Sequence, residues 1–103
     1  MPHMYRVVVD AEAFGKMQDA VEFAARVSEA FADKLIHAYF DSMEKLRDNP
    51  SGYARYFSEK FPDMELHKLL FSQFHRLVFS VKDGIVYVLD IQDCRQDTDK
   101  HIV

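Results

Sequence analysis

The stretch Phe74-His-Arg-Leu-Val-Phe-Ser-Val-Lys-Asp-Gly-Ile-Val-Tyr-Val-Leu-Asp-Ile91 decides the fold. Two apolar runs, 74–81 and 85–91, flank the dipeptide Asp83-Gly84. This dipeptide is typical of a two-residue type I′ hairpin, because both turn positions need positive φ. The second run is almost continuously apolar, which favours a strand covered on both faces. We therefore expect an antiparallel pair of strands that turns at Asp83 and Gly84.

The hairpin sets a register in which Lys82 pairs with Ile85. One face should then pack under helices, and it carries Leu77, Phe79, Val81, Val86 and Val88. The other face is mixed, and it carries Arg76, Val78, Ser80, Tyr87, Leu89 and Ile91. An apolar face that no helix covers is a candidate binding surface.

The first half of the chain predicts a strand over 5–9, where β-branched residues dominate, and then two helices. Asp10 is a good N-cap for the first helix, whose apolar stripe repeats at helical spacing. The second helix should run over 29–48 and end at Asn49-Pro50, because the residue before proline avoids the helical region. A bend is expected over 28–30, and one long kinked helix is the alternative.

The segment between the second helix and the hairpin has mixed character. We expect a loop over 51–63, with a short helix over 53–60 as an alternative within it. A further strand is expected over 65–71. The chain as a whole therefore predicts one α+β domain, with two helices packed on an antiparallel sheet made mainly by the last forty residues.

The composition of the chain excludes several classes of function. The chain has 103 residues, which is enough for one core, and a net charge of −4 with a pI of about 5.6. An acidic chain is a poor non-specific nucleic-acid binder, because counterion release needs clustered Lys and Arg. Cys94 is the single cysteine, so no intramolecular disulfide forms. With neither a signal peptide nor a membrane span in the pattern, we expect a cytoplasmic protein.

Histidine and cysteine spacing predicts no metal or thiol chemistry. The histidines are His3, His37, His67, His75 and His101. None pairs with another His or with Cys94 at ligand spacing, so we predict no metal site and no cofactor. Cys94 has no catalytic partner beside it in the sequence, which disfavours a thiol enzyme.

Several short motifs resemble, in order and spacing, the RelE/ParE family of bacterial toxins. They are Phe31-Ala-Asp-Lys-Leu35, Met43-Glu-Lys-Leu-Arg-Asp-Asn-Pro50, Lys68-Leu-Leu70, Phe74-His-Arg-Leu-Val-Phe79, Ile85-Val-Tyr-Val-Leu89 and Asp93-Cys-Arg-Gln-Asp97. The resemblance covers nearly the whole chain. It implies a single RelE/ParE-like domain over 1–103, with an N-terminal strand, a two-helix hairpin and a three-stranded antiparallel meander.

The resemblance also implies a function. Such a protein is the toxin of a type II toxin–antitoxin (plasmid stabilisation) system, which inhibits growth and is neutralised by a cognate antitoxin. RelE-like members cleave mRNA on the ribosome as metal-independent endoribonucleases. ParE-like members poison DNA gyrase without being known as nucleases. A third alternative is a non-toxic module that only binds antitoxin.

In the ribonuclease branch, the resemblance assigns the phosphate-binding arginines to Arg76 and Arg95. A guanidinium suits this role, because it stays protonated and makes bidentate contacts to phosphate oxygens. Lys68 matches a further basic position, His75 replaces a more usual tyrosine, and His101 falls near another tyrosine position. The antitoxin should cross the helix hairpin and the mixed sheet face, where the candidate contacts are Val78, Tyr87 and Leu89.

The arginines also have structural interpretations. Arg95 could pair with Asp93 or Asp97, and Arg76 could pair with an aspartate of the tail. His75 is a general-base candidate by its pKa range, although a solvated strand-end histidine is the plainer interpretation. The tail aspartates, which we expect to be solvated, are Asp90, Asp93, Asp97 and Asp99. These aspartates lower the electrostatic potential around Arg95. Together with the net negative charge of the chain, they suit a gyrase-directed toxin better than a ribosomal nuclease.

Overall fold

The computed structural model describes residues 4–103 and has the expected α+β architecture. A strand, β1 (Arg6–Val9), leads into two helices, α1 (Ala11–Val27) and α2 (Glu29–Asp48). The remaining strands are β2 (Arg55–Tyr56), β3 (Leu66–Leu70), β4 (His75–Lys82) and β5 (Ile85–Asp93). Single 3₁₀ turns occupy Pro50–Gly52 and Thr98–Lys100. The loop after α2 thus holds a two-residue strand and not the helix considered over 53–60.

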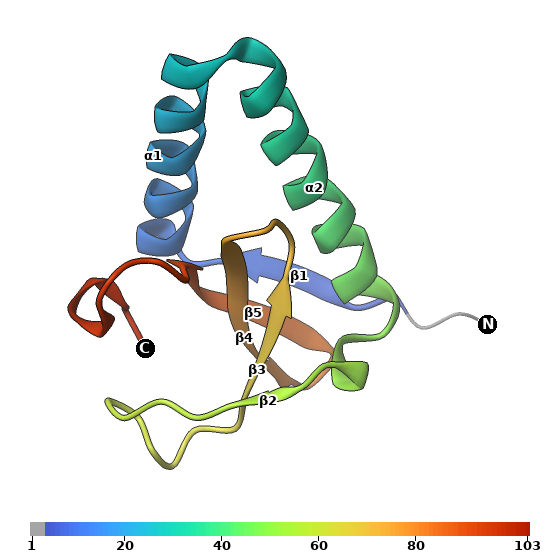
Figure 1. Ribbon diagram of the computed structural model, residues 1–103. Coiled ribbons are helices and arrows are strands. Elements are labelled where there is room, and N and C mark those ends of the chain that lie inside the picture. Colours follow the sequence, from blue (N-terminus) through green and yellow to red (C-terminus); the bar gives the residue numbers. More distant parts are fainter. Residues whose placement is uncertain (1–3) are drawn as a thin grey trace.

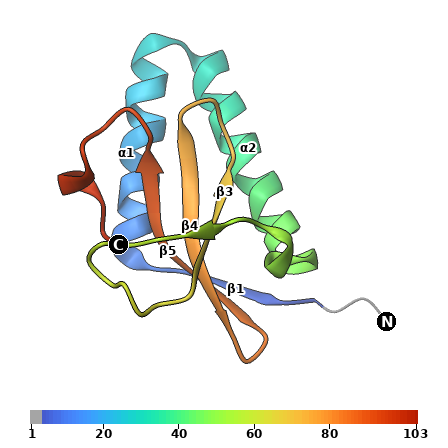
Figure 2. The same ribbon diagram turned by 60° about the horizontal axis from the view of Figure 1, so that its bottom comes forward.

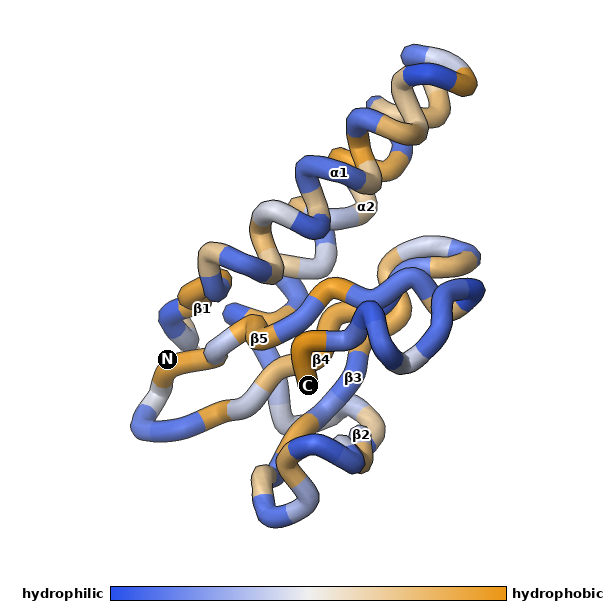
Figure 3. Tube along the Cα trace, turned by 90° about the vertical axis from the view of Figure 1, so that its left-hand side faces the viewer, coloured by the Kyte–Doolittle hydropathy of each residue, from blue (hydrophilic) through white to orange (hydrophobic). Residues whose placement is uncertain are grey.

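The helices form a hairpin that stands on one side of the sheet (Figure 1). Ser28 separates them with extended backbone (φ −168°, ψ 150°) and caps α2, because its hydroxyl accepts the main-chain N–H of Phe31. The alternative of one long kinked helix is therefore wrong. Asp10 caps α1 as expected, and α2 ends at Asp48 before Asn49-Pro50. The far end of the hairpin projects beyond the sheet (Figure 3).

The sheet has five strands in the order β1-β5-β4-β3-β2. β1 runs parallel to β5, and every other neighbouring pair is antiparallel, so the sheet is mixed and larger than the antiparallel sheet expected from the sequence. The turn at Asp83 and Gly84 has positive φ at both positions (53° and 77°), as the dipeptide predicted. Lys82 pairs with Ile85, which confirms the start of the register.

A β-bulge at Leu89 changes the register beyond that start. Phe79 pairs with Val88, but Val78 pairs with Asp90, so Leu89 is the extra residue. Because side chains alternate along a strand, the bulge exchanges the faces of all residues that follow it. Ile91 therefore lies on the helix side with Leu77, and its expected place on the mixed face is wrong.

The core lies between the helices and one side of the sheet, which we call the helix face. Its fully buried sheet residues include Leu77, Phe79, Val86 and Val88. We call the opposite side the tail face, because the last three residues of the chain lie against it (Figure 2). Neither α1 nor α2 contains a stretch long and apolar enough to cross a membrane.

Candidate functional site

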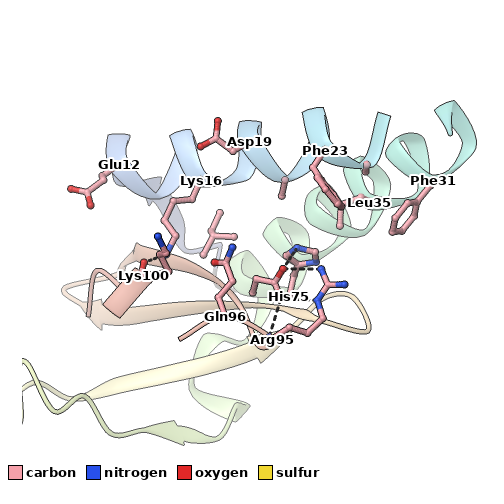
Figure 4. Close-up of a pocket in the computed structure, with 14 residues that line it drawn as sticks. Glu12, Lys16, Asp19, Phe23, Phe31, Leu35, His75, Arg95, Gln96 and Lys100 are labelled. Atoms are coloured by element: carbon pink, nitrogen blue, oxygen red, sulfur yellow. Dashed lines mark hydrogen bonds and ion pairs between the residues drawn. The ribbon is translucent and has the colours of Figure 1, made fainter. Parts of the chain in front are cut away.

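A cleft of about 550 Å³ lies between the helix hairpin and the end of the sheet (Figure 4). The cleft is lined by Phe23 of α1, by Phe31 and Leu35 of α2, and, at the end of the sheet, by His75 and Arg95. The cleft exists because the hairpin extends past the sheet while the strands stop short beneath it. It combines an apolar wall with polar groups from β4 and the segment after β5, as ligand sites commonly do.

His75 lies at the first position of β4 and is only 9 % exposed. The hydroxyl oxygen of the nearby Ser72 accepts the main-chain N–H groups of Phe74 and His75 at 3.2 and 3.0 Å. Because both lone pairs are then used, the hydroxyl donates its proton to Nδ1 of His75, at 2.8 Å. This bonding places the ring proton on Nε2, which lies 3.9 Å from Oδ2 of Asp93. Burial lowers the pKa of His75, and the negative charge of Asp93 only partly opposes this. The interpretation of His75 as a solvated histidine is therefore wrong.

Asp93 and Arg95 form a bidentate pair at the mouth of the cleft. Arg95 donates from Nε to Oδ1 at 3.0 Å and from Nη2 to Oδ2 at 2.8 Å. The guanidinium also lies 4.2 Å from the centre of the Phe74 ring. The hydrogen bond from Arg95 is the main reason that the pKa of Asp93 lies below its ordinary range. The predicted structural pairing of Arg95 with Asp93 is confirmed, and it compensates much of the positive charge that a phosphate would need.

The tail face holds a second polar cluster, which the sequence did not reveal. Arg76 donates from Nε to Oε1 of Gln92 at 2.7 Å and lies 5.2 Å from the centre of the Tyr56 ring. Gln92 is fully buried, and its amide donates to Asp90 at 2.9 Å and to the Tyr56 hydroxyl at 3.1 Å. Arg76 is thus held by an amide and a ring, and not by the tail aspartate that the sequence suggested.

Asp90 is fully buried at the centre of this cluster, so its expected place in a solvated tail is wrong. β1 ends opposite Val88, which leaves the edge of β5 open beside Asp90. Lys16 reaches past this edge from α1, and its Nζ lies 2.6 Å from Oδ1 of Asp90. A buried charge is tolerated when it is paired and hydrogen-bonded, and Asp90 is both.

The five predicted catalytic residues fall into two groups. His75 and Arg95 share the cleft, whereas Arg76 belongs to the tail face, because adjacent residues of a strand point to opposite sides. Lys68 pairs with Val78 and also lies on the tail face, and His101 is buried near it at 8 % exposure. The sheet therefore separates Arg76 from Arg95.

The predicted antitoxin contacts are only partly accessible. Val78 is fully buried, because Val103 packs against it together with Leu66. Tyr87 and Leu89 are half-buried on the same side. Val78 is therefore unavailable to a partner while the tail stays in place. A second groove, of about 370 Å³, lies on the other flank of the hairpin, between Phe14 and Val21 of α1 and Ile36 and Phe40 of α2.

Among residues 4–103, no three His, Cys, Asp or Glu side chains gather closely enough to share a metal ion. His3 lies outside the described residues. Cys94 is exposed, with its thiol unbridged. No protein-family model matches the chain, and no curated protein is found to be similar to it.

Proposed function

We propose that this protein is the toxin of a bacterial type II toxin–antitoxin system, with a RelE/ParE-like fold, acting in the cytoplasm and silenced by a cognate antitoxin. The order of elements supports the fold: a strand, a helix hairpin, then β3, β4 and β5 as consecutive antiparallel neighbours. Because one fold hosts many functions, the function rests on the surfaces described above.

The apolar flanks of the helix hairpin carry the proposal. Phe14 and Phe40 are 46 % and 59 % exposed on one flank, and Phe23 and Phe31 are 59 % and 43 % exposed on the other. Each flank also contains a groove. Soluble proteins rarely leave such contiguous apolar surface uncovered unless a partner binds it. An amphipathic antitoxin helix is the partner that such grooves fit.

Growth inhibition by binding is the mechanism we favour, with DNA gyrase as the target of the ParE-like branch. A two-arginine nuclease needs both guanidinium groups preorganised on one phosphate. Here Arg76 and Arg95 belong to opposite faces of the sheet, and each is engaged by its own neighbours. A toxin that acts by binding does not need two arginines on one phosphate. The net charge of −4 also suits a gyrase-binding toxin better than a toxin that acts on the ribosome.

Metal-independent mRNA cleavage at the ribosome is the second candidate, and one observation favours it. The cleft brings a buried imidazole, His75, beside the guanidinium of Arg95. A guanidinium can bind a phosphate, and the neutral imidazole can take a proton from a ribose hydroxyl at Nδ1 once that hydroxyl displaces the Ser72 hydroxyl.

Induced expression, followed by incorporation of labelled thymidine and amino acids, tests the proposal. We expect growth arrest with early loss of thymidine incorporation, and we expect the Arg76→Ala, Arg95→Ala double variant to remain toxic. Early loss of amino-acid incorporation that the double variant abolishes would instead establish the nuclease. Absence of arrest from a folded protein would remove the toxin proposal and leave an antitoxin-binding module.

A further inference from the structure

The last three residues of the chain lie against the tail face without belonging to any strand. Val103 is 7 % exposed and packs on Leu66 and Val78. Its main-chain oxygen accepts the Tyr56 hydroxyl at 3.0 Å, and the N–H of Ile102 donates to Oδ2 of Asp90 at 2.8 Å. A few polar contacts therefore hold this segment in place, with a small apolar contact beneath it.

Two lysines fix the chain just before Ile102. Lys16, already paired with Asp90, also donates to the main-chain oxygen of Lys100 at 2.9 Å. Lys60, in the loop between β2 and β3, donates to the main-chain oxygen of His101. Residues 94–100, which connect β5 to this segment, are all exposed. Ile102 also packs against the helix-face cluster, so the segment can leave the sheet at the loss of this contact and of the small contact made by Val103.

His101 is the weak point of the arrangement. It is 8 % exposed, and its Nε2 is the one buried side-chain nitrogen or oxygen in residues 4–103 that has no hydrogen-bond partner. The charged groups around it come from four elements: Lys16 of α1, Arg76 of β4, Asp90 of β5 and Lys60 of the loop. Tyr56 of β2 bonds the segment through its hydroxyl, and the segment itself carries Asp97, Asp99 and Lys100. Three cations thus surround His101, and the single carboxylate is already bonded to Lys16 and Gln92.

We propose that residues 97–103 form a pH-sensitive strap, which closes over Leu66 and Val78 while His101 is neutral and opens when His101 is protonated. A proton on His101 would add a fourth positive charge to a buried site with no acceptor for it. Opening the strap places the charge in water and uncovers Val78. The strap is a property of this chain's own residues, and it stands whether or not the protein is a toxin.

The direction of the effect follows from proton linkage. Burial lowers the pKa of His101 in the closed state, Asp90 opposes this shift, and the three cations reinforce it. In the open state the pKa returns to about 6.5, so acidification favours opening. If the closed strap takes up no proton, the ratio of open to closed molecules rises about tenfold between pH 7.5 and 5.5.

Amide hydrogen exchange by NMR, with intrinsic rates removed, measures this ratio. We expect the protection factor of the Ile102 amide to fall about tenfold between pH 7.5 and 5.5, while that of Val88 in β5 reports on global unfolding. The His101→Gln variant should lose this pH dependence, and the matched variant His37→Gln, at an exposed position on α2, should keep it.

Either of two results would overturn the strap. The first is an Ile102 protection factor that stays constant down to pH 5.5 in the unmodified protein. The second is the same pH dependence in His101→Gln as in the unmodified protein. The first measurement needs no substitution, so it decides the matter even if the variant folds poorly.

Discussion

The helices cover one face of the sheet and the last three residues of the chain cover part of the other, and these two covers are built differently. On the helix face, a continuous apolar cluster joins α1 and α2 to Leu77, Phe79, Val86 and Val88. On the tail face, the apolar contact is small and one buried carboxylate, Asp90, holds the covering segment by its main chain. Apolar burial is strong but non-directional, whereas a hydrogen-bonded charge fixes position at a large desolvation cost. The first cover therefore suits a permanent core, and the second suits a segment that can move.

Phe79→Ala should cause the largest loss of stability. Phe79 is fully buried on the helix face, between Tyr53 and His67, whose rings lie 6.3 and 5.7 Å from it. Removing a buried phenyl ring costs about 3–5 kcal/mol of unfolding free energy. The size-matched pair is Val88→Ala on the helix face and Val78→Ala on the tail face, both at fully buried positions, which should cost about 3 and about 2 kcal/mol. Urea unfolding of both variants measures the difference, and equal losses would refute the contrast between the faces.

Asp90→Asn should cost about 3 kcal/mol, because it leaves Lys16 without its buried partner. The double variant Asp90→Asn, Lys16→Met should recover part of this loss, since it removes the uncompensated charge as well. Thermal unfolding of four proteins, the unmodified protein, Asp90→Asn, Lys16→Met and the double variant, gives the coupling between the two sites. If the losses simply add, the ion pair does not organise the tail face.

The helix face was predictable from the sequence and the tail face was not. Asp83-Gly84 and the helical stripes are local signals, and they gave the turn, both helices and the apolar side of the hairpin. The bulge at Leu89 depends on partners that are remote in the sequence: Asp90 is buried only because Lys16, Gln92 and Ile102 converge on it. A carboxylate inside an apolar run was the available signal. The pairing of Arg95 with Asp93 is local and was anticipated, whereas the separation of Arg76 from Arg95 required the three-dimensional register.

On the helix face, the buried His75 should make the free energy of unfolding depend on pH. Its folded-state pKa is lowered, mainly by burial, so the unfolded chain binds a proton that the folded protein does not. Stability is then full above about pH 7.5 and falls as the pH drops through the unfolded value of about 6.5, by no more than about 1.4 kcal/mol per pH unit. In the His75→Phe variant the loss of stability between pH 7.5 and 5.5 should be smaller, and the loss that remains is due to His101. An unchanged slope in urea unfolding between pH 7.5 and 5.5 would show that His75 is solvated.

Arg95→Gln should have the smallest effect on stability at neutral pH, because the side chain of Arg95 is 52 % exposed. The substitution should nevertheless raise the pKa of Asp93 toward its ordinary value, since the Arg95 hydrogen bond is the main cause of the lowered pKa. A lowered carboxyl pKa contributes stability above the unfolded value that is lost as pH falls through the folded one, so the variant should be slightly less stable at neutral pH and should approach the stability of the unmodified protein in acid. The carboxyl carbon shift of Asp93, followed through an acid titration, measures this, with Arg76→Gln on the opposite face as the control. If the pKa of Asp93 is the same in all three proteins, Arg95 is not paired in solution. Its guanidinium would then be free to bind phosphate beside His75, and the nuclease mechanism would regain the charge that the ion pair denies it.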